Sequence, residues 1–354
     1  IEAGISTDHE CCELDEALEK VRYGMKIQIR EGSAAKNFEA LIPLMGTHPD
    51  MIMFCSDDRH PNDLIKEHIN GHVRKAIQKG YDLFDILRTA TLNPIRHYNL
   101  DVGLLRGGDD ADFIIVNNLE DFEVMATYIK GKQVSDKKTS LIKRTGLVPA
   151  NIFKANPITE KDILVKPLGN QINVIEALDG ELITKGTKAL INTENGNVVG
   201  NPENDILKLV VLNRYRDSKP AVAFIKGFGL SHGAIASTVA HDSHNIIATG
   251  TSDELIVSAI NSLIGMQGGI IATDGNEELS LPLPIAGLMG KDDGYQVAEM
   301  YERIDKKAKD MGSTLQAPFM TLSFMALLVI PELKLSDEGL FDGNRFSFTP
   351  LFVS

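Results

Sequence analysis

The stretch Met51–Pro61 (MIMFCSDDRHP) constrains the fold of this chain more than any other. It begins with a continuous apolar run without alternation, which is typical of a strand buried on both faces. The run leads directly into two adjacent carboxylates, Asp57 and Asp58. Buried like charges repel, so they require a cation, a metal ion or a shared proton. Because chemistry in parallel α/β folds takes place at the carboxyl ends of strands, we predict that this pair marks the active-site end of a strand.

The first part of the chain repeats the order strand, polar end, helix. We predict strands at residues 4–7, 25–29 and 51–55, and helices at 14–23, 33–45 (with Ser33 as N-cap) and 61–80. Each strand ends in its own polar cluster: Asp8-His9-Glu10, Arg30-Glu31 and Asp57-Asp58. This order predicts βα units with a parallel sheet, and three clusters on one rim are typical of the mouth of a (β/α)8 barrel.

Only three such units are present, and the chain opens with Ile1-Glu2-Ala3-Gly4-Ile5 rather than with methionine. We therefore expect the C-terminal part of a longer chain, preceded by about five barrel units, or roughly 150–200 residues. The predicted fold class is α/β plus α+β, and the predicted division is 1–92, the last part of the barrel; 93–140, a small β appendage and linker; and 141–354, an α+β domain.

Residues beyond the third unit carry less distinct patterns. A helix at 81–91 is predicted to be broken by Asn93-Pro94, and strands are predicted at 111–117 and 126–129 with a turn at Gly131-Lys132. In the last domain we predict helices at 252–264 and 296–311, and strands at 163–166, 172–177, 182–191, 206–211, 221–225, 234–239, 245–249, 269–273 and 278–281.

Charge and cysteine usage exclude some classes of partner. The net charge of −13 argues against nucleic acid and anionic membranes, since both require a basic face. No apolar run approaches the roughly 18 residues of a membrane helix. The three cysteines include the neighbours Cys11 and Cys12 and cannot form a disulfide framework. A reducing compartment fits this usage, and we expect a cytoplasmic protein.

His9 and Asp57 form a candidate metal pair, because they follow two different strands of the same predicted sheet. Imidazole and carboxylate ligands suit Zn, Mn or Fe. A bound divalent ion lowers the pKa of water, and a neighbouring carboxylate can accept the proton. Two ligands do not complete a site, so the others are expected elsewhere.

At this point the motifs resemble a known family. Ser6–Glu10, Arg30–Asn37 and Cys55–Pro61 are similar, in order and spacing, to the last three barrel units of bacterial adenine deaminases in the amidohydrolase superfamily. Thr89–Pro94 resembles the general superfamily exit from the barrel. Later stretches resemble the domain found at the end of adenine deaminases: Gly227–Leu230, Ala240–Asn245, Leu281–Met289 and Val329–Leu333.

The resemblance implies hydrolysis of adenine to hypoxanthine and ammonia at a binuclear site, with manganese or iron favoured and zinc as an alternative. His9 would be the strand 6 ligand and Asp57 the strand 8 ligand and proton acceptor. The family's His-x-His pair, bridging carboxylate and further histidine are absent from this sequence, so the chain alone is expected to be inactive. Further catalytic roles are predicted for Asp58 and Glu31, and substrate contacts for Arg30, Ser33 and Asp58.

The last domain offers a second group of candidates. His241, Asp242, His244 and Asn245 lie close together in sequence, where they could bind a third metal, close over the barrel mouth or form a polar turn between two strands. Two other functions stay open: a different amidohydrolase, such as a dihydroorotase-like enzyme or a deacetylase, and a non-catalytic module for oligomerisation or binding. We also expect a homo-oligomer.

Overall fold

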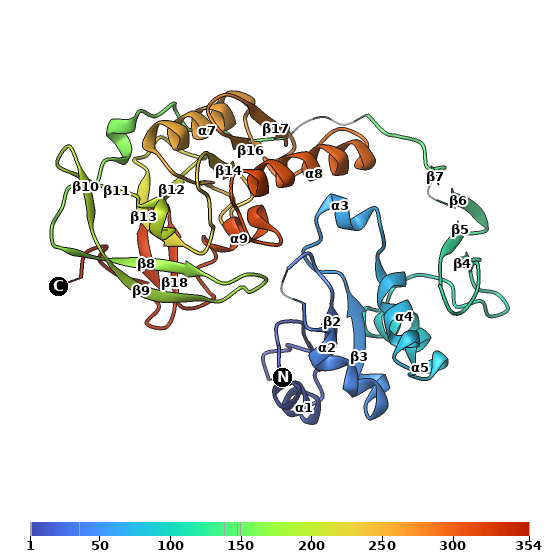
Figure 1. The fold of residues 1–354 in the computed structure, drawn as a ribbon. Coiled ribbons are helices and arrows are strands. Elements are labelled where there is room, and N and C mark those ends of the chain that lie inside the picture. The colour runs from blue at the N-terminus through green and yellow to red at the C-terminus, as the bar shows by residue number, and fades with distance from the viewer. Residues whose placement is uncertain (1, 35, 138, 147, 149, 354) are drawn as a thin grey trace. The chain divides into compact units, whose positions relative to one another are not determined.

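The structure is a computed structural model that describes residues 2–34, 36–137, 139–146, 148 and 150–353. It separates into two compact units, residues 1–146 and 147–354 (Figure 1). Each unit has its own sheets and its own hydrophobic core. Within the described ranges, no helix combines the length and the apolar character needed to cross a membrane.

The first unit is built on a three-stranded parallel sheet in the order β1 (Thr7–Asp8), β2 (Lys26–Arg30), β3 (Ile52–Cys55). Helix α1 (Leu14–Arg22) connects β1 to β2. Helix α2 (Phe38–Leu41) and the 3-10 helices η1 (Ile42–Gly46) and η2 (Pro49–Met51) connect β2 to β3. Parallel strands joined by helical segments agree with the α/β prediction, whereas the closed (β/α)8 barrel stays a prediction.

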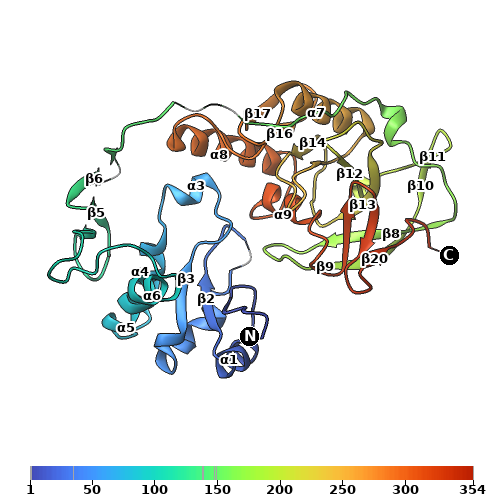
Figure 2. The same cartoon turned by 180° about the vertical axis from the view of Figure 1, so that it is seen from behind.

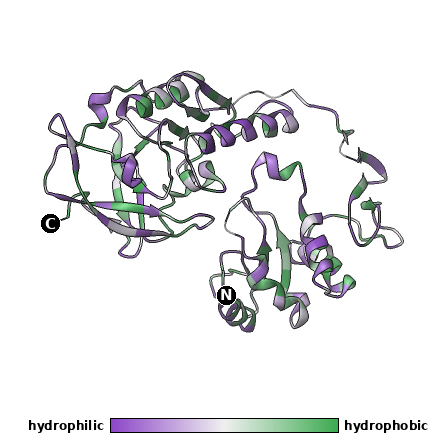
Figure 3. Cartoon of the chain, viewed as in Figure 1, coloured by the Kyte–Doolittle hydropathy of each residue, from purple (hydrophilic) through white to green (hydrophobic). Residues whose placement is uncertain are grey.

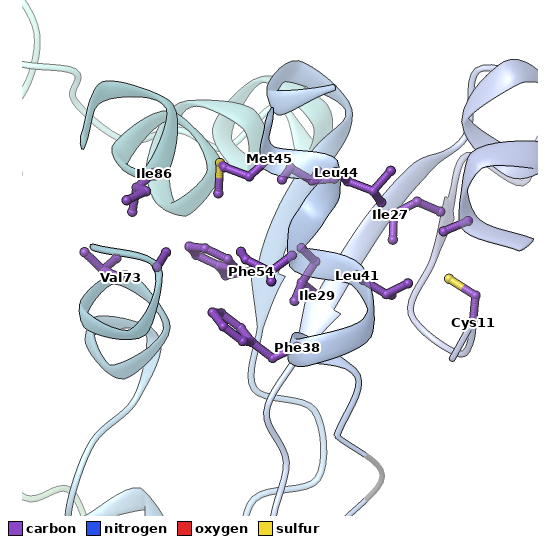
Figure 4. Packing of buried hydrophobic residues seen from close by; sticks show 14 of the residues in the cluster. Cys11, Ile27, Ile29, Phe38, Leu41, Leu44, Met45, Phe54, Val73 and Ile86 are labelled. Atoms are coloured by element: carbon purple, nitrogen blue, oxygen red, sulfur yellow. The ribbon is translucent and has the colours of Figure 1, made fainter. Parts of the chain in front are cut away.

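The core of this unit explains why the apolar run forms a strand. Ile52, Met53 and Phe54 are successive in β3 and are all at most 6% exposed, so both faces of the strand are covered, as predicted. On one face, the ring of Phe54 lies 6.2 Å from that of Phe38 in α2. Figure 4 shows these two rings facing Val73. Covering both faces fixes β3, and with it the loop that begins at Ser56.

Two predicted helices of this unit are wrong in their extent. The helix expected at 33–45 begins only at Phe38, with Asn37 rather than Ser33 at its N-cap, and it tightens into η1 where Pro43 lacks a backbone N–H. The helix expected at 61–80 is two helices, α3 (Pro61–Leu64) and α4 (Ile69–Gln78). At the start of α4, the Asn70 side chain accepts a hydrogen bond from the backbone N–H of His68, the N-cap residue.

The predicted break at Asn93-Pro94 is also wrong. Helix α5 (Leu83–Leu87) runs through the π-helix η3 (Arg88–Leu92) into α6 (Asn93–Tyr98), which is seen from behind in Figure 2. Pro94 follows directly on η3, so its missing backbone N–H falls where the helix changes from π-helical to α-helical hydrogen bonding.

A small antiparallel sheet completes the unit, with strands β4 (Phe113–Val116), β5 (Val124–Ile129), β6 (Lys132–Asp136) and β7 (Thr139–Ser140). The predicted β appendage and its turn at Gly131 are therefore present. Lys130 and Gly131 both have positive φ, as a tight hairpin turn between β5 and β6 requires.

The second unit contains an eight-stranded sheet in the order β17-β16-β14-β15-β12-β13-β8-β9. All neighbours are antiparallel except β13 and β8. The strands are β8 (Gln171–Ala177), β9 (Thr184–Leu190), β12 (Leu207–Leu212), β13 (Ala221–Lys226), β14 (Ala234–Ser237), β15 (Ile246–Gly250), β16 (Gly269–Thr273) and β17 (Glu278–Pro282). They correspond to eight of the predicted strands, with ends that differ by at most two residues, and β16 matches its predicted range at both ends.

Three helices pack on this sheet, as the α+β prediction requires. Helix α7 (Asp253–Met266) buries Ile256, Ala259 and Ile260 against β14, β15 and β16. Helix α8 (Gly294–Asp310) packs on β16 and β17, and α9 (Pro318–Phe324) packs on β14 and β15. Figure 3 shows that α8 is largely hydrophilic, which is typical of a helix with one face on the core and the other in water.

One predicted strand is absent and several elements were not predicted. Residues 163–166 form no strand. Ile163 is the last residue of a 3-10 helix, η4 (Glu160–Ile163), which begins with a capping box of Thr159 and Asp162, and Val165 makes an isolated antiparallel bridge with Val198. The unpredicted elements are α9, the 3-10 helix η5 (Pro202–Asn204), the hairpin β10 (Asn192–Glu194) and β11 (Asn197–Val199), and the sheet β18 (Leu333–Ser336), β19 (Gly339–Asp342) and β20 (Ser347–Phe348).

Candidate active site

The carboxyl ends of the three parallel strands bring together side chains that are far apart in sequence. His9 follows β1, Arg30 ends β2, and Asp57 follows β3. The His9 Nε2 atom lies 3.6 Å from Asp57 Oδ1, and Arg30 Nη1 lies 3.1 Å from Asp57 Oδ2. The sequence-predicted pair of His9 and Asp57 therefore shares one site, with Arg30 bound to the opposite carboxylate oxygen.

Glu10 is a fourth member of this site, and the sequence reasoning gave it no role. Its Oε1 lies 3.3 Å from His9 Nε2 and its Oε2 lies 3.1 Å from Arg30 Nη1. Arg30 is only 1% exposed, so its guanidinium needs these two carboxylates for compensation. The available signal was its position directly after His9, in the same polar cluster.

The pair of His9 and Glu10 shifts the titration of both groups. The hydrogen bond with Glu10 raises the pKa of His9 above its usual value, against the effect of burial, and Asp57 adds to the rise. The same hydrogen bond, together with the charge of Arg30, lowers the pKa of Glu10. A metal ion that binds His9 must therefore displace a proton more tightly held than usual.

Asp57 has a left-handed backbone conformation, with φ of 49°. Asp and Asn tolerate this region better than other side chains apart from glycine. The neighbouring Cys55 is an unsuitable metal ligand, because burial and the charge of Asp57 raise the pKa of its thiol to about 12.

The structure gives the other predicted residues of this unit different surroundings. The Glu31 carboxylate pairs with Lys75 of α4. The backbone carbonyl of Asp58 accepts a hydrogen bond from the N–H of Ser33. The Ser33 hydroxyl donates to Asp63 at 2.7 Å and accepts from the N–H of His60 at 2.9 Å. Ser33 therefore ties the loop after β2 to the loop after β3.

These two hydrogen bonds of the Ser33 hydroxyl predict the effect of Ser33→Ala. The change leaves the Asp63 carboxylate and the His60 N–H without their shared partner, and we expect the first unit to lose about 1–2 kcal/mol of unfolding free energy. Urea unfolding of the variant checks this. The control is Ser6→Ala, because the Ser6 hydroxyl is exposed and its hydrogen bond to His97 Nε2, at 3.2 Å, is exposed as well. Unchanged stability of Ser33→Ala would contradict this structural role of the hydroxyl.

The second group of candidates forms a turn between β14 and β15 in the second unit. His241 Nδ1 lies 2.6 Å from Asp242 Oδ1, and the His241 ring lies 5.8 Å from that of Phe324. Burial, then His241 and Arg214, lower the pKa of His244. Asn245 is buried and its Oδ1 accepts from the N–H of Arg214 at 3.4 Å. The polar turn is thus present, while the third metal stays a prediction.

Comparison with known proteins decides the family. The model of the amidohydrolase family matches residues 3–134, and that of the adenine deaminase C-terminal domain matches residues 181–347. Three curated proteins named adenine deaminase match nearly all of the chain. They come from Sulfurovum sp. (strain NBC37-1), with 56% identity over 98% of the chain, Methanosarcina mazei, with 50% over 100%, and Salinibacter ruber, with 50% over 99%. The chain belongs to the adenine deaminase family.

The chain covers 64%, 66% and 65% of these three relatives, just under two thirds of their length. The two family matches divide the candidates in the same way as the two units do. The amidohydrolase match contains His9, Glu10, Arg30 and Asp57, and the adenine deaminase C-terminal match contains the turn at 241–245.

Amidohydrolase membership implies a divalent metal cofactor, and the geometry around Asp57 fits part of such a site. Two ligands at about 2.1 Å from one ion lie roughly 3.0–3.5 Å apart. The 3.6 Å between His9 Nε2 and Asp57 Oδ1 is close to this separation. Among the described residues, no group of three or more His, Cys, Asp or Glu side chains is arranged to hold a metal ion. His9 and Asp57 therefore fit as two ligands of an incomplete set.

Proposed function

We propose that this chain forms part of an enzyme that hydrolyses adenine to hypoxanthine and ammonia. The observation that carries the proposal is the meeting of His9 and Asp57 at the carboxyl ends of β1 and β3. The names of the relatives and of the matching C-terminal domain support adenine as the substrate.

In this proposal His9 and Asp57 would hold a divalent metal ion as part of a binuclear site. Nitrogen and carboxylate ligands suit manganese or iron, with zinc as a further option. The remaining ligands would come from residues outside those described here, since two ligands leave a site incomplete. When bound, the metal would supply the nucleophile by lowering the pKa of water.

The residues of this chain would direct the proton. Arg30 holds Asp57 Oδ2, so Oδ1 stays turned toward His9. Asp57 would accept a proton of the attacking water and relay it to the ring nitrogen beside C6 of adenine. It would then pass the second proton, from the hydroxyl now bound at C6, to the amino group, which leaves as ammonia while the oxygen becomes the carbonyl of hypoxanthine. Asp58 and Glu31 would assist in catalysis, although the Glu31 carboxylate must first break its ion pair with Lys75. The proposed substrate contacts are those of Arg30, Ser33 and Asp58.

The remaining expectations are proposals of the same kind. We propose a cytoplasmic homo-oligomer that acts on a small molecule and binds neither nucleic acid nor membranes, in line with the net charge of −13. The turn at His241, Asp242, His244 and Asn245 is proposed to contribute to function from the second unit.

The test is ammonia release from adenine in the presence of Mn²⁺. It compares this chain with a full-length form, made by joining the chain to the part of the Sulfurovum relative that it does not match. Activity in the full-length form alone is expected. Activity in neither would favour another amidohydrolase substrate or a non-catalytic module. Activity of this chain without the joined part would show that the metal site needs no further ligands.

A further inference from the structure

Asn37 is a buried residue that connects two of the strand ends carrying the candidate site. It is 2% exposed. Its Oδ1 accepts from the backbone N–H of Arg30 at 2.8 Å, and its Nδ2 donates to the carbonyls of His9 at 3.3 Å and Cys11 at 3.1 Å. One side chain therefore links the end of β2 to the loop after β1.

Asn37 stands at a helix N-cap, but its side chain does not make the hydrogen bond that is usual at that position. Asn37 is the N-cap of α2, where asparagine commonly accepts a hydrogen bond from the first turn of its own helix. In this structure it makes no such capping bond. The amide is instead used for three bonds to the segments that carry His9 and Arg30.

These bonds act on the site through the backbone. His9 and Arg30 face Asp57 from two different strand ends, so the distance between those ends sets where the His9 ring lies relative to the carboxylate. Groups that orient metal ligands in this way typically change metal affinity or activity by about 10–100-fold when they are replaced.

We infer that Asn37 is a positioning residue that fixes His9 against the pair of Arg30 and Asp57, and so sets the affinity of the site for a divalent metal ion. The inference rests on the proposed function for its metal, whereas the coupling of the two strand ends is a property of this chain alone.

The substitution Asn37→Asp tests the bridge with little change in size. One carboxylate oxygen can still accept from the N–H of Arg30. The other replaces the NH₂ group and can only accept, so it faces the carbonyls of His9 and Cys11 without a proton to share.

Asn93 provides a matched control. It is 5% exposed, and its Nδ2 donates to the carbonyls of Pro49 and Ile52, both at 2.8 Å. Ile52 begins β3, at the end opposite Asp57. Asn93→Asp therefore makes the same chemical change in the same core, away from the site.

The first measurement is amide hydrogen exchange by mass spectrometry on this chain. Asn37→Asp is expected to speed exchange in residues 8–12 and 28–32, whereas Asn93→Asp is expected to act near residues 49–53. Unchanged exchange in both 8–12 and 28–32 for Asn37→Asp would overturn the inference, whatever the protein catalyses.

The second measurement is the Kd for Mn²⁺ of the full-length form, by titration calorimetry. Asn37→Asp is expected to weaken binding about 10–100-fold, and Asn93→Asp to leave it within about twofold. Equal losses in both variants would overturn the positioning role. If exchange responds as expected while the unsubstituted full-length form does not deaminate adenine, the positioning of His9 and Arg30 is supported and the proposed function fails.

Discussion

Asp57→Asn in the full-length form is expected to lower kcat for adenine by about 10²–10⁴-fold, the range that a positioned proton-transfer group contributes. The amide has nearly the shape of the carboxylate, but it cannot accept the proton of the attacking water. It is also a poorer metal ligand beside His9. Steady-state ammonia release, with adenine and Mn²⁺ in excess, measures the change.

The fold is expected to survive this substitution. Asparagine tolerates the left-handed backbone of residue 57, and its oxygen can still accept from Arg30 Nη1. Glu10 continues to compensate the buried guanidinium. The control is Asp50→Asn, an exposed carboxylate near the opposite end of β3. Near-normal turnover of Asp57→Asn would mean that another group takes the proton.

Lys334→Met is expected to raise the unfolding free energy of the second unit, and this gain should depend on pH. Lys334 lies in β18, is 0% exposed, and donates to the carbonyl of Leu182 at 2.6 Å. It forms no ion pair within the part of the chain that the structure describes. Burial lowers the pKa of Lys334 to about 7.

The direction of the pH dependence follows from the number of protons bound in the folded and the unfolded state. Between pH 7 and the ordinary lysine pKa, the unfolded chain holds a proton on Lys334 that the folded chain has lost, so stability rises with pH in this window. Below pH 7 both states are protonated, and the folded state bears the full cost of a buried charge. Methionine removes that cost but leaves the Leu182 carbonyl without its donor.

We therefore expect Lys334→Met to stabilise the second unit by up to about 3 kcal/mol at pH 6, with a gain that shrinks toward pH 10. Urea unfolding at both pH values measures it, and Lys185→Met, at an exposed lysine of β9, is the control. A gain that is the same at pH 6 and pH 10 would contradict the lowered pKa.

The positions of His9 and Asp57 at the ends of two strands could be predicted from the sequence. The apolar run that forms β3 required burial on both faces, and that burial places Asp57 at the end of the strand, opposite His9. Local signals of this kind depend on neighbouring residues only. The division into 1–92, 93–140 and 141–354 stays a prediction, while the structure separates the chain between residues 146 and 147.

The sequence could not predict contacts between segments far apart in the chain. Asn37 and Ser33 look alike as helix N-caps, but each uses its side chain to bind another loop. Glu10 joins the site through Arg30, which follows it by a whole helix and strand. The hairpin of β10 and β11 is a different case, because its Asn195-Gly196 turn is a strong local signal for a hairpin in the sequence itself.

The most direct test of the account is an anomalous difference map at the manganese absorption edge, from crystals of the full-length form grown with Mn²⁺. The account predicts a peak within about 2.0–2.3 Å of both His9 Nε2 and Asp57 Oδ1. Manganese bound in the protein but away from both atoms would contradict the assignment of this pair as metal ligands, and with it the proposed mechanism.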